Sequence, residues 1–287
     1  MKAIFKKELR SYFHNMIGPV FMAAVMLFTG LYFCVNNIYY GYPFFGVSLS
    51  GVSVVLLLLV PVLTMRSFAE EKKSKTDQLL LTSPLSVTQI VMGKFLAMAG
   101  VLGICMIICC LGPVVLHFYG AGSFLADYAA ILAFFLMGCA YMSIGMFISS
   151  LTESQVLAAV GTFIILLILQ LSDGLAGLVS SSSLLSFIGM IVIILIVALL
   201  IYYMTKNIYV AEGTGLVLAA AAAITYHIKK TLFEGLISTI LSSISLASRF
   251  DTVLNQTLNV SDFIFYISVS GLFVFLTVQA VQKRRWS

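Results

Sequence analysis

Residues 66–94 read RSFAEEKKSKTDQLLLTSPLSVTQIVMGK, and they interrupt a chain that is otherwise strongly apolar. The segment carries eight charged side chains between two hydrophobic runs that are each long enough to cross a bilayer. A charge at the bilayer centre costs several kcal/mol, so this segment must lie at a membrane face. Its excess of Lys and Arg predicts the cytoplasmic face. Because Leu79–Leu81 and Leu85 add an apolar cluster, we predict a short amphipathic element that contacts a soluble partner.

The composition of the whole chain agrees with a membrane protein. The 287 residues are 61% hydrophobic and 9% charged, whereas a soluble domain has about 25% charged residues. The mean hydropathy is +1.09. We therefore expect an all-α polytopic membrane protein with a single transmembrane domain over residues 1–287. The net charge of +5 is modest and does not indicate a nucleic-acid partner.

Apolar runs predict about eight membrane-embedded helices. The sixth and seventh are alternatively one re-entrant hairpin, which leaves six full crossings. With the N-terminus inside, three of the sixteen Lys and Arg residues fall outside, and both termini are cytoplasmic. The predicted helices are 17–35, 46–65, 95–118, 124–148, 155–171, 184–204, 210–226 and 263–281.

Two segments outside these runs have amphipathic patterns. Residues 1–16 alternate apolar and basic side chains at helical spacing, which predicts an interfacial helix against anionic headgroups. In residues 227–262, apolar side chains recur every three or four positions from Leu232 to Ile244. This spacing predicts an amphipathic helix on the extracytoplasmic surface. Within the apolar runs, Pro61 predicts a bend and Gly112-Pro113 predicts a break.

The apolar runs contain few side chains that could bind an ion or catalyse a reaction. Their centres carry no ionisable residue, and we interpret Asp127, Asp173 and Asp262 at the outer ends as solvated helix caps. This pattern argues against an ion-coupled carrier or channel, which needs a buried acid or a broken-helix ion site. It also argues against an intramembrane hydrolase. The five cysteines lie in apolar runs without His or acid at ligand spacing, so we expect packing residues and no metal site.

The sequence also shows no P-loop motif that would bind a nucleotide. Gly93-Lys94 lacks the upstream glycine of a P-loop. If ATP drives transport, a second chain must bind it, and residues 66–94 and 1–16 are then the contact surfaces.

Four stretches, residues 66–94, 248–287, 6–13 and 150–159, resemble a known family. This family is the ABC-2-type exporter permeases, and the resemblance is strongest to the branch with gliding-motility and nitrous-oxide-maturation permeases. The residues 248–287, the opening KKELRSYF at 6–13 and SLTESQVLAA at 150–159 are similar to the same family. In residues 66–94 the resemblance lies in Glu70, Glu71, Lys72, Thr76, Leu79, Leu80, Ser83, Pro84, Ile90, Gly93 and Lys94.

The resemblance implies a permease subunit of an ATP-driven exporter in the bacterial cytoplasmic membrane. Two permeases, identical or paralogous, would pair, and each would dock an ABC ATPase that binds ATP and Mg²⁺, so this chain itself needs no cofactor. Residues 66–94 would form the cytoplasmic coupling segment, with the ATPase contact at Glu70, Glu71, Lys72, Thr76, Leu79, Leu80, Ser83 and Pro84. The exported substrate is expected to be hydrophobic or amphipathic.

Other interpretations of the same residues remain open. The chain is alternatively a membrane scaffold that transmits ATPase motion to an extracytoplasmic accessory protein without passing substrate. Glu70 and Glu71 are alternatively a solvated charge pair, and Leu79–Leu81 alternatively pack on membrane lipid.

Overall fold

The computed structural model describes residues 2–76, 86–120, 122–178, 235–255 and 259–286, with isolated positions between 189 and 216. The chain divides into two compact units. The first contains Met1–Ile168 and Arg249–Ser287, and the second contains Leu169–Ser248. Where the chain is described, its regular structure is helical and no strand occurs. The all-α prediction is therefore confirmed.

Six helical segments in the described ranges are long and apolar enough to cross a membrane. They coincide with six of the eight predicted runs, while the runs 184–204 and 210–226 lie outside the described residues except at isolated positions. Three of the segments each contain two helical elements. Ile17–Tyr39 contains α2 (Ile17–Tyr32) and η1 (Phe33–Tyr39), Gly46–Lys73 contains α3 (Gly46–Thr64) and α4 (Ala69–Lys73), and Val87–Phe118 contains α6 (Val87–Cys109) and α7 (Leu111–Phe118). The other three are single helices: Phe124–Leu151 is α8, Gln155–Gly177 lies in α9 (Gln155–Leu178), and Val260–Lys283 lies in α14 (Val260–Trp286).

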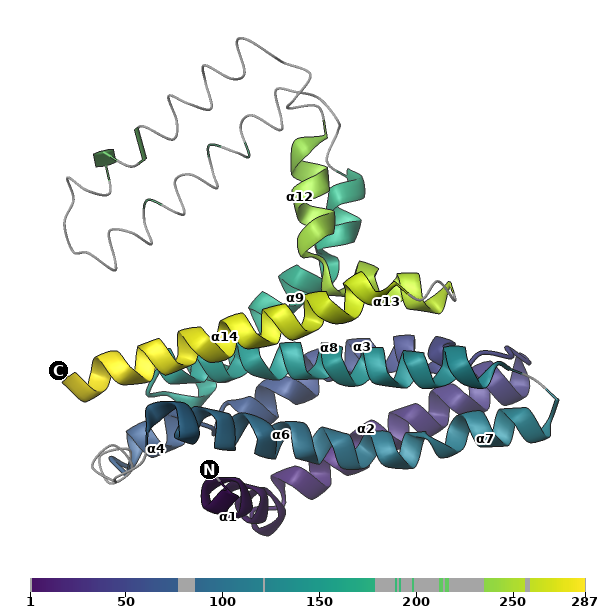
Figure 1. Cartoon of the computed structure of the whole chain (residues 1–287), viewed down its shortest axis with the longest axis horizontal. Coiled ribbons are helices and arrows are strands. Elements are labelled where there is room, and N and C mark those ends of the chain that lie inside the picture. Colours follow the sequence, from purple (N-terminus) through teal and green to yellow (C-terminus); the bar gives the residue numbers. More distant parts are fainter. Residues whose placement is uncertain are drawn as a thin grey trace. The chain divides into compact units, whose positions relative to one another are not determined.

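Helix α8 is the centre of the first unit. It packs most extensively against α14 and also contacts α3 and α6 (Figure 1). Small residues make this close packing possible, as they do in membrane helix bundles. A Cβ atom on Gly138 would lie 2.3 Å from Leu102 Cδ2 of α6, so the leucine side chain packs directly on the glycine and would have to move for a larger residue. The core therefore follows from the Gly, Ala and Ser content of α8.

The third membrane segment begins earlier than the sequence predicts. We expected its start at residue 95, but α6 begins at Val87, where the Ser86 Oγ accepts a hydrogen bond from the Gln89 N–H at 3.3 Å. This side-chain cap provides an acceptor for an N–H that has no partner within the helix. As a result Lys94 lies inside α6 and not in the segment before it.

The predicted break in the same segment is confirmed. Helix α6 ends at Cys109 and α7 begins at Leu111. Pro113 has no N–H to donate to the carbonyl four residues earlier, which is that of Cys109. The interruption therefore falls just before the Gly112-Pro113 pair.

Two of the three aspartates that the sequence assigned to the outer ends are not solvated caps, so this interpretation is wrong for Asp127 and Asp262. Asp127 is 1% exposed and accepts a hydrogen bond from the Phe45 N–H at 2.8 Å. Asp262 is 2% exposed and pairs with Arg249 at 3.1 Å. Both begin helices whose neighbours in space bring donors to the carboxylate. Asp173, in contrast, is exposed.

The helix predicted from the apolar repeat Leu232 to Ile244 is confirmed over its described part, and a second helix follows it. Helix α12 covers Leu236–Ile244 and α13 covers Leu246–Leu254, while residues 227–234 lie outside the described part. Ser245 between them has an extended backbone and its Oγ accepts a hydrogen bond from the Ser248 N–H at 3.1 Å. Ser245 therefore caps the second helix instead of continuing the first.

Candidate functional site

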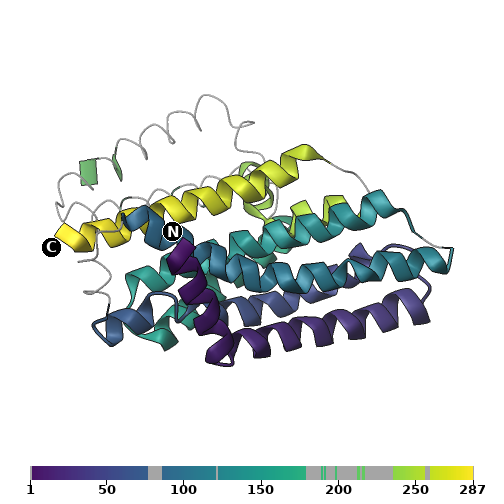
Figure 2. The same ribbon diagram turned by 60° about the horizontal axis from the view of Figure 1, so that its bottom comes forward.

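Four charged residues of the 66–94 segment lie close to α1 (Lys2–His14) in the first unit, namely Arg66, Glu70, Glu71 and Lys94. Figure 2 shows α1 lying at a steep angle to the long helices, next to the end of the bundle that carries α4. The N-terminal part of α6 and the C-terminal end of α8 complete this region. Four elements that are far apart in the sequence therefore meet around one group of charges.

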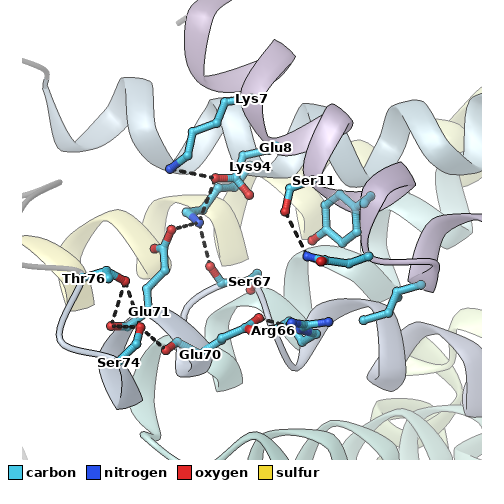
Figure 3. A pocket seen from close by; sticks show the side chains of 13 residues that line it. Lys7, Glu8, Ser11, Arg66, Ser67, Glu70, Glu71, Ser74, Thr76 and Lys94 are labelled. Carbon is cyan, nitrogen blue, oxygen red and sulfur yellow. Dashed lines mark hydrogen bonds and ion pairs between the residues drawn. The ribbon is translucent and has the colours of Figure 1, made fainter.

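Lys94 is at the centre of this group. Its side chain is only 2% exposed, and its Nζ lies 2.8 Å from Glu71 Oε1 and 3.4 Å from Glu8 Oε1. The Nζ also donates to the Ser67 carbonyl at 2.8 Å (Figure 3). A buried charge is tolerated only when it is paired and hydrogen-bonded, and here three acceptors surround one ammonium. We call Lys94, Glu8 and Glu71 the Lys94 joint.

Helix α1 turns one face toward the bundle. Ile4 and Tyr12 are buried and Glu8 lies between them, since positions four apart share a helix face. The basic residues Lys6 and Arg10 are exposed. The helix is therefore confirmed, although its inward face includes an acid that the apolar pattern did not indicate.

Close contact between α1 and α6 depends on Gly93. A Cβ atom at this position would lie 2.8 Å from Ile4 Cγ2, which is too close for two carbon atoms.

Burial raises the pKa of the Tyr12 phenol above its usual range, and the nearby Glu8 and Glu71 carboxylates raise it further. Tyr12 is thus protonated at neutral pH and packs as a neutral group.

Helix α4 is attached to the end of α8. The Ser149 Oγ accepts hydrogen bonds from the Phe68 N–H at 3.2 Å and the Ala69 N–H at 3.1 Å. It also donates to the Met65 carbonyl at 3.1 Å. Lys72 Nζ donates to the Ser150 carbonyl. A serine of α8 therefore does for α4 what an N-cap residue does within a helix, because it provides an acceptor for N–H groups of the first turn.

The C-terminal end of α4 is a Schellman motif. The Thr76 N–H donates to the Glu71 carbonyl at 3.0 Å, and the Lys75 N–H donates to the Lys72 carbonyl at 3.1 Å. Lys75 has φ +56°, at the position where glycine is usual. Helix α4 is therefore a defined five-residue element with both ends satisfied.

A pocket of about 240 Å³ separates α1 from α4 (Figure 3). Among the residues that the structure describes, Ser67 Oγ is the buried side-chain polar atom without a hydrogen-bond partner, and Ser67 lines this pocket. Arg66 and Glu70 also line it and form an i,i+4 ion pair in which Arg66 Nε lies 2.5 Å from Glu70 Oε2. These two side chains are partly exposed, so water screens their attraction and their pairing contributes at most about 1 kcal/mol.

The described residues of the predicted ATPase contact all have partners. Glu70 pairs with Arg66, Glu71 with Lys94, Lys72 with the Ser150 carbonyl, and Thr76 with the Glu71 carbonyl. The alternative of a solvated pair is therefore wrong for Glu71, whose side chain is 17% exposed. The predicted contacts Leu79, Leu80, Ser83 and Pro84 lie outside the described residues.

The sequence did not predict the roles of Glu8 and Ser149. Glu8 is 86 residues from its partner Lys94, and Ser149 is 81 residues from Phe68. The available signals were weak. Glu8 interrupts an otherwise basic helix, and Ser149-Ser150 ends a long apolar run.

Comparison with known families now decides the class of protein. The family model described as ABC-2 family transporter protein matches residues 35–281, which is most of the chain. The chain belongs to the ABC-2 transporter family. The ABC-2 chain is therefore a multi-pass membrane protein and the permease subunit of an ABC transporter, and membership implies pairing with an ABC ATPase subunit. No curated protein and no solved structure matches it significantly.

The family match includes α4 and the N-terminal part of α6, so Glu71 and Lys94 lie within it. Helix α1 precedes the matched residues. Two members of the Lys94 joint are thus in the family region of this ABC-2 permease, while Glu8 comes from the segment before it.

Proposed function

We propose that this ABC-2 permease belongs to an ATP-driven exporter of a hydrophobic or amphipathic substrate in the bacterial cytoplasmic membrane. In this proposal both termini and residues 66–94 are cytoplasmic, and the ATPase that binds ATP and Mg²⁺ contacts the described residues Glu70, Glu71, Lys72 and Thr76. A second permease, identical or paralogous, pairs with the chain. The resemblance of residues 66–94 and 248–287 favours the branch with gliding-motility and nitrous-oxide-maturation permeases.

One observation supports the proposal that the ATPase moves the membrane helices through α4. Helix α4 is held at its start by Ser149 of α8 and at Glu71 by Lys94 of α6. Because these bonds reach two different membrane helices, a displacement of α4 is transmitted to both instead of being absorbed by a loop. A short rigid element with an exposed surface is what an ATPase needs in order to move a permease.

The contact is tested by site-specific photo-crosslinking. Lys73 is exposed on α4, and Tyr119 is 82% exposed just after α7, at the far end of the next membrane segment, Val87–Phe118. A photoreactive residue at 73 is expected to crosslink a chain with a P-loop, whereas the same residue at 119 is the matched control. Crosslinking from 119 and not from 73 would refute the assignment of the inner face.

Membrane orientation is tested separately. A Ser74→Cys variant places an exposed thiol just after α4. When the native cysteines, including the exposed Cys34, are replaced by alanine, an impermeant maleimide is expected to label position 74 in inverted vesicles and not in intact cells. Reconstitution of the permease and its ATPase in liposomes without extracytoplasmic proteins then separates export from a scaffold role, because a scaffold alone gives no ATP-dependent flux.

A further inference from the structure

Two elements of the inner end, α1 and α4, are connected indirectly. In the described part of the chain, the ion pairs that relate them both end on Lys94, with Glu8 from α1 and Glu71 from α4. Elsewhere the 240 Å³ pocket lies between the two elements. Beside this pocket, Lys94 is the ion-pair partner that α1 and α4 share.

We propose that Lys94 is a positioning residue that makes α1 follow the movements of α4. The proposal rests on the proposed function, in which the ATPase moves α4. In it, a displacement of α4 passes through Glu71 to Lys94 and from Lys94 to Glu8. The N-terminal helix is then a moving part of the transporter and not a static membrane anchor.

The charges explain why a lysine holds this position. The Glu8 and Glu71 side chains are 13% and 17% exposed, so water screens them only partly. With the ammonium between them each carboxylate has a counter-ion, and without it two like charges face each other in a poorly solvated space. Loss of the Lys94 charge is therefore expected to push α1 away from α4.

The connections of α1 allow such a movement. Helix α1 passes into α2 through Met16, an exposed residue with φ +58°. A non-glycine residue rarely adopts this conformation, and it is found at turns and hinges. On its other side α1 lies against α6, where Gly93 permits the close approach. The Lys94 joint is thus the polar attachment of a helix that is otherwise held by apolar packing.

Hydrogen–deuterium exchange of the full chain in lipid nanodiscs tests the joint itself. Lys94→Met is expected to accelerate exchange of the α1 amides by at least about tenfold, which corresponds to roughly 1.4 kcal/mol of local stability. Lys7→Met is the matched control, since Lys7 is 4.0 Å from Glu8 but its side chain is 66% exposed.

If Lys94→Met does not assemble, Glu8→Gln tests the ion pair from the other side, because it removes the Glu8 charge and leaves the Lys94–Glu71 pair intact. Unchanged α1 exchange in Lys94→Met, or in Glu8→Gln, would overturn the proposal. Equal acceleration in Lys7→Met would overturn it as well, because the effect would then come from net charge alone.

A second measurement uses the permease purified with its ATPase and trapped with ADP and vanadate. In the wild type, trapping is expected to change exchange in both α4 and α1, and in Lys94→Met in α4 alone. If α1 still responds in Lys94→Met, the joint does not transmit the movement, although the proposed function stands. If α4 does not respond in the wild type, the proposed function fails, while the exchange of the chain alone still tests the joint.

Discussion

Ser149→Ala is expected to release α4 from the membrane bundle. The Ser149 Oγ accepts two hydrogen bonds, from the Phe68 and Ala69 N–H groups, and donates one to the Met65 carbonyl. Ser149 and Ala69 are fully buried and Phe68 is 5% exposed, so water does not readily replace the lost partner. A buried donor without an acceptor costs about 1–3 kcal/mol, and two such donors destabilise the start of α4 by at least about 2 kcal/mol.

The measurement is amide exchange in residues 66–76 of the full chain. A loss of about 2 kcal/mol corresponds to roughly thirtyfold faster exchange. Ser150→Ala is the matched control, because the Ser150 Oγ bonds only within its own helix, to the Phe147 carbonyl at 2.6 Å. Its backbone carbonyl, which accepts from Lys72, is unchanged. The control is expected to stay within about 0.5 kcal/mol of the wild type.

In the assembled transporter, Ser149→Ala is also expected to lower the flux per ATP hydrolysed while the ATPase still binds, because α4 would move without α8. Unchanged exchange in residues 66–76, or equal acceleration by Ser150→Ala, would refute the reasoning that Ser149 anchors this helix. Normal flux per ATP despite accelerated exchange would show that the α8 attachment is structural and carries no force.

Lys75→Gly is expected to slow exchange at the end of α4, by up to about 1 kcal/mol, because glycine adopts a positive φ without strain; faster exchange would contradict this. Gly93→Ala is expected to displace α1 at a cost of about 1–3 kcal/mol, measured as faster α1 exchange. Gly100→Ala, whose Cβ would have ordinary contacts at 3.7 Å, is its neutral control. Asp127→Ala is expected to lower the free energy of unfolding by about 1–3 kcal/mol, because the buried Phe45 N–H loses its acceptor. The measurement is the melting temperature in detergent, and an unchanged melting temperature would contradict the expectation.

The sequence was sufficient for features that depend on composition and local spacing. A run of about twenty apolar residues must be helical in a bilayer, because every backbone polar group needs a partner within the segment. Six of the predicted helices and the interruption before Pro113 were therefore found correctly. A similar argument places residues 66–76 outside the apolar runs, because charged side chains avoid hydrocarbon.

The side-chain partners of the charged residues could not be predicted in this way, because they depend on which helices pack against each other. The outer aspartates were predicted to be solvated, but the Phe45 N–H and the Arg249 side chain surround two of them. Likewise Lys94 was assigned to the end of the cytoplasmic segment 66–94, although an earlier start of α6 places it inside the bundle. Periodicity reports which face of a helix is apolar and contains no information about the element that covers it.

The sequence by itself determined that this chain is a helical membrane protein with a charged segment between its second and third apolar runs. Only the tertiary structure decided that α1, α4, α6 and α8 converge there, so that one buried lysine and one serine hold the segment. The physical reason is distance along the chain. Hydrophobic burial and hydrocarbon length act on each segment separately, whereas an ion pair between residues 86 positions apart exists only after the helices have packed.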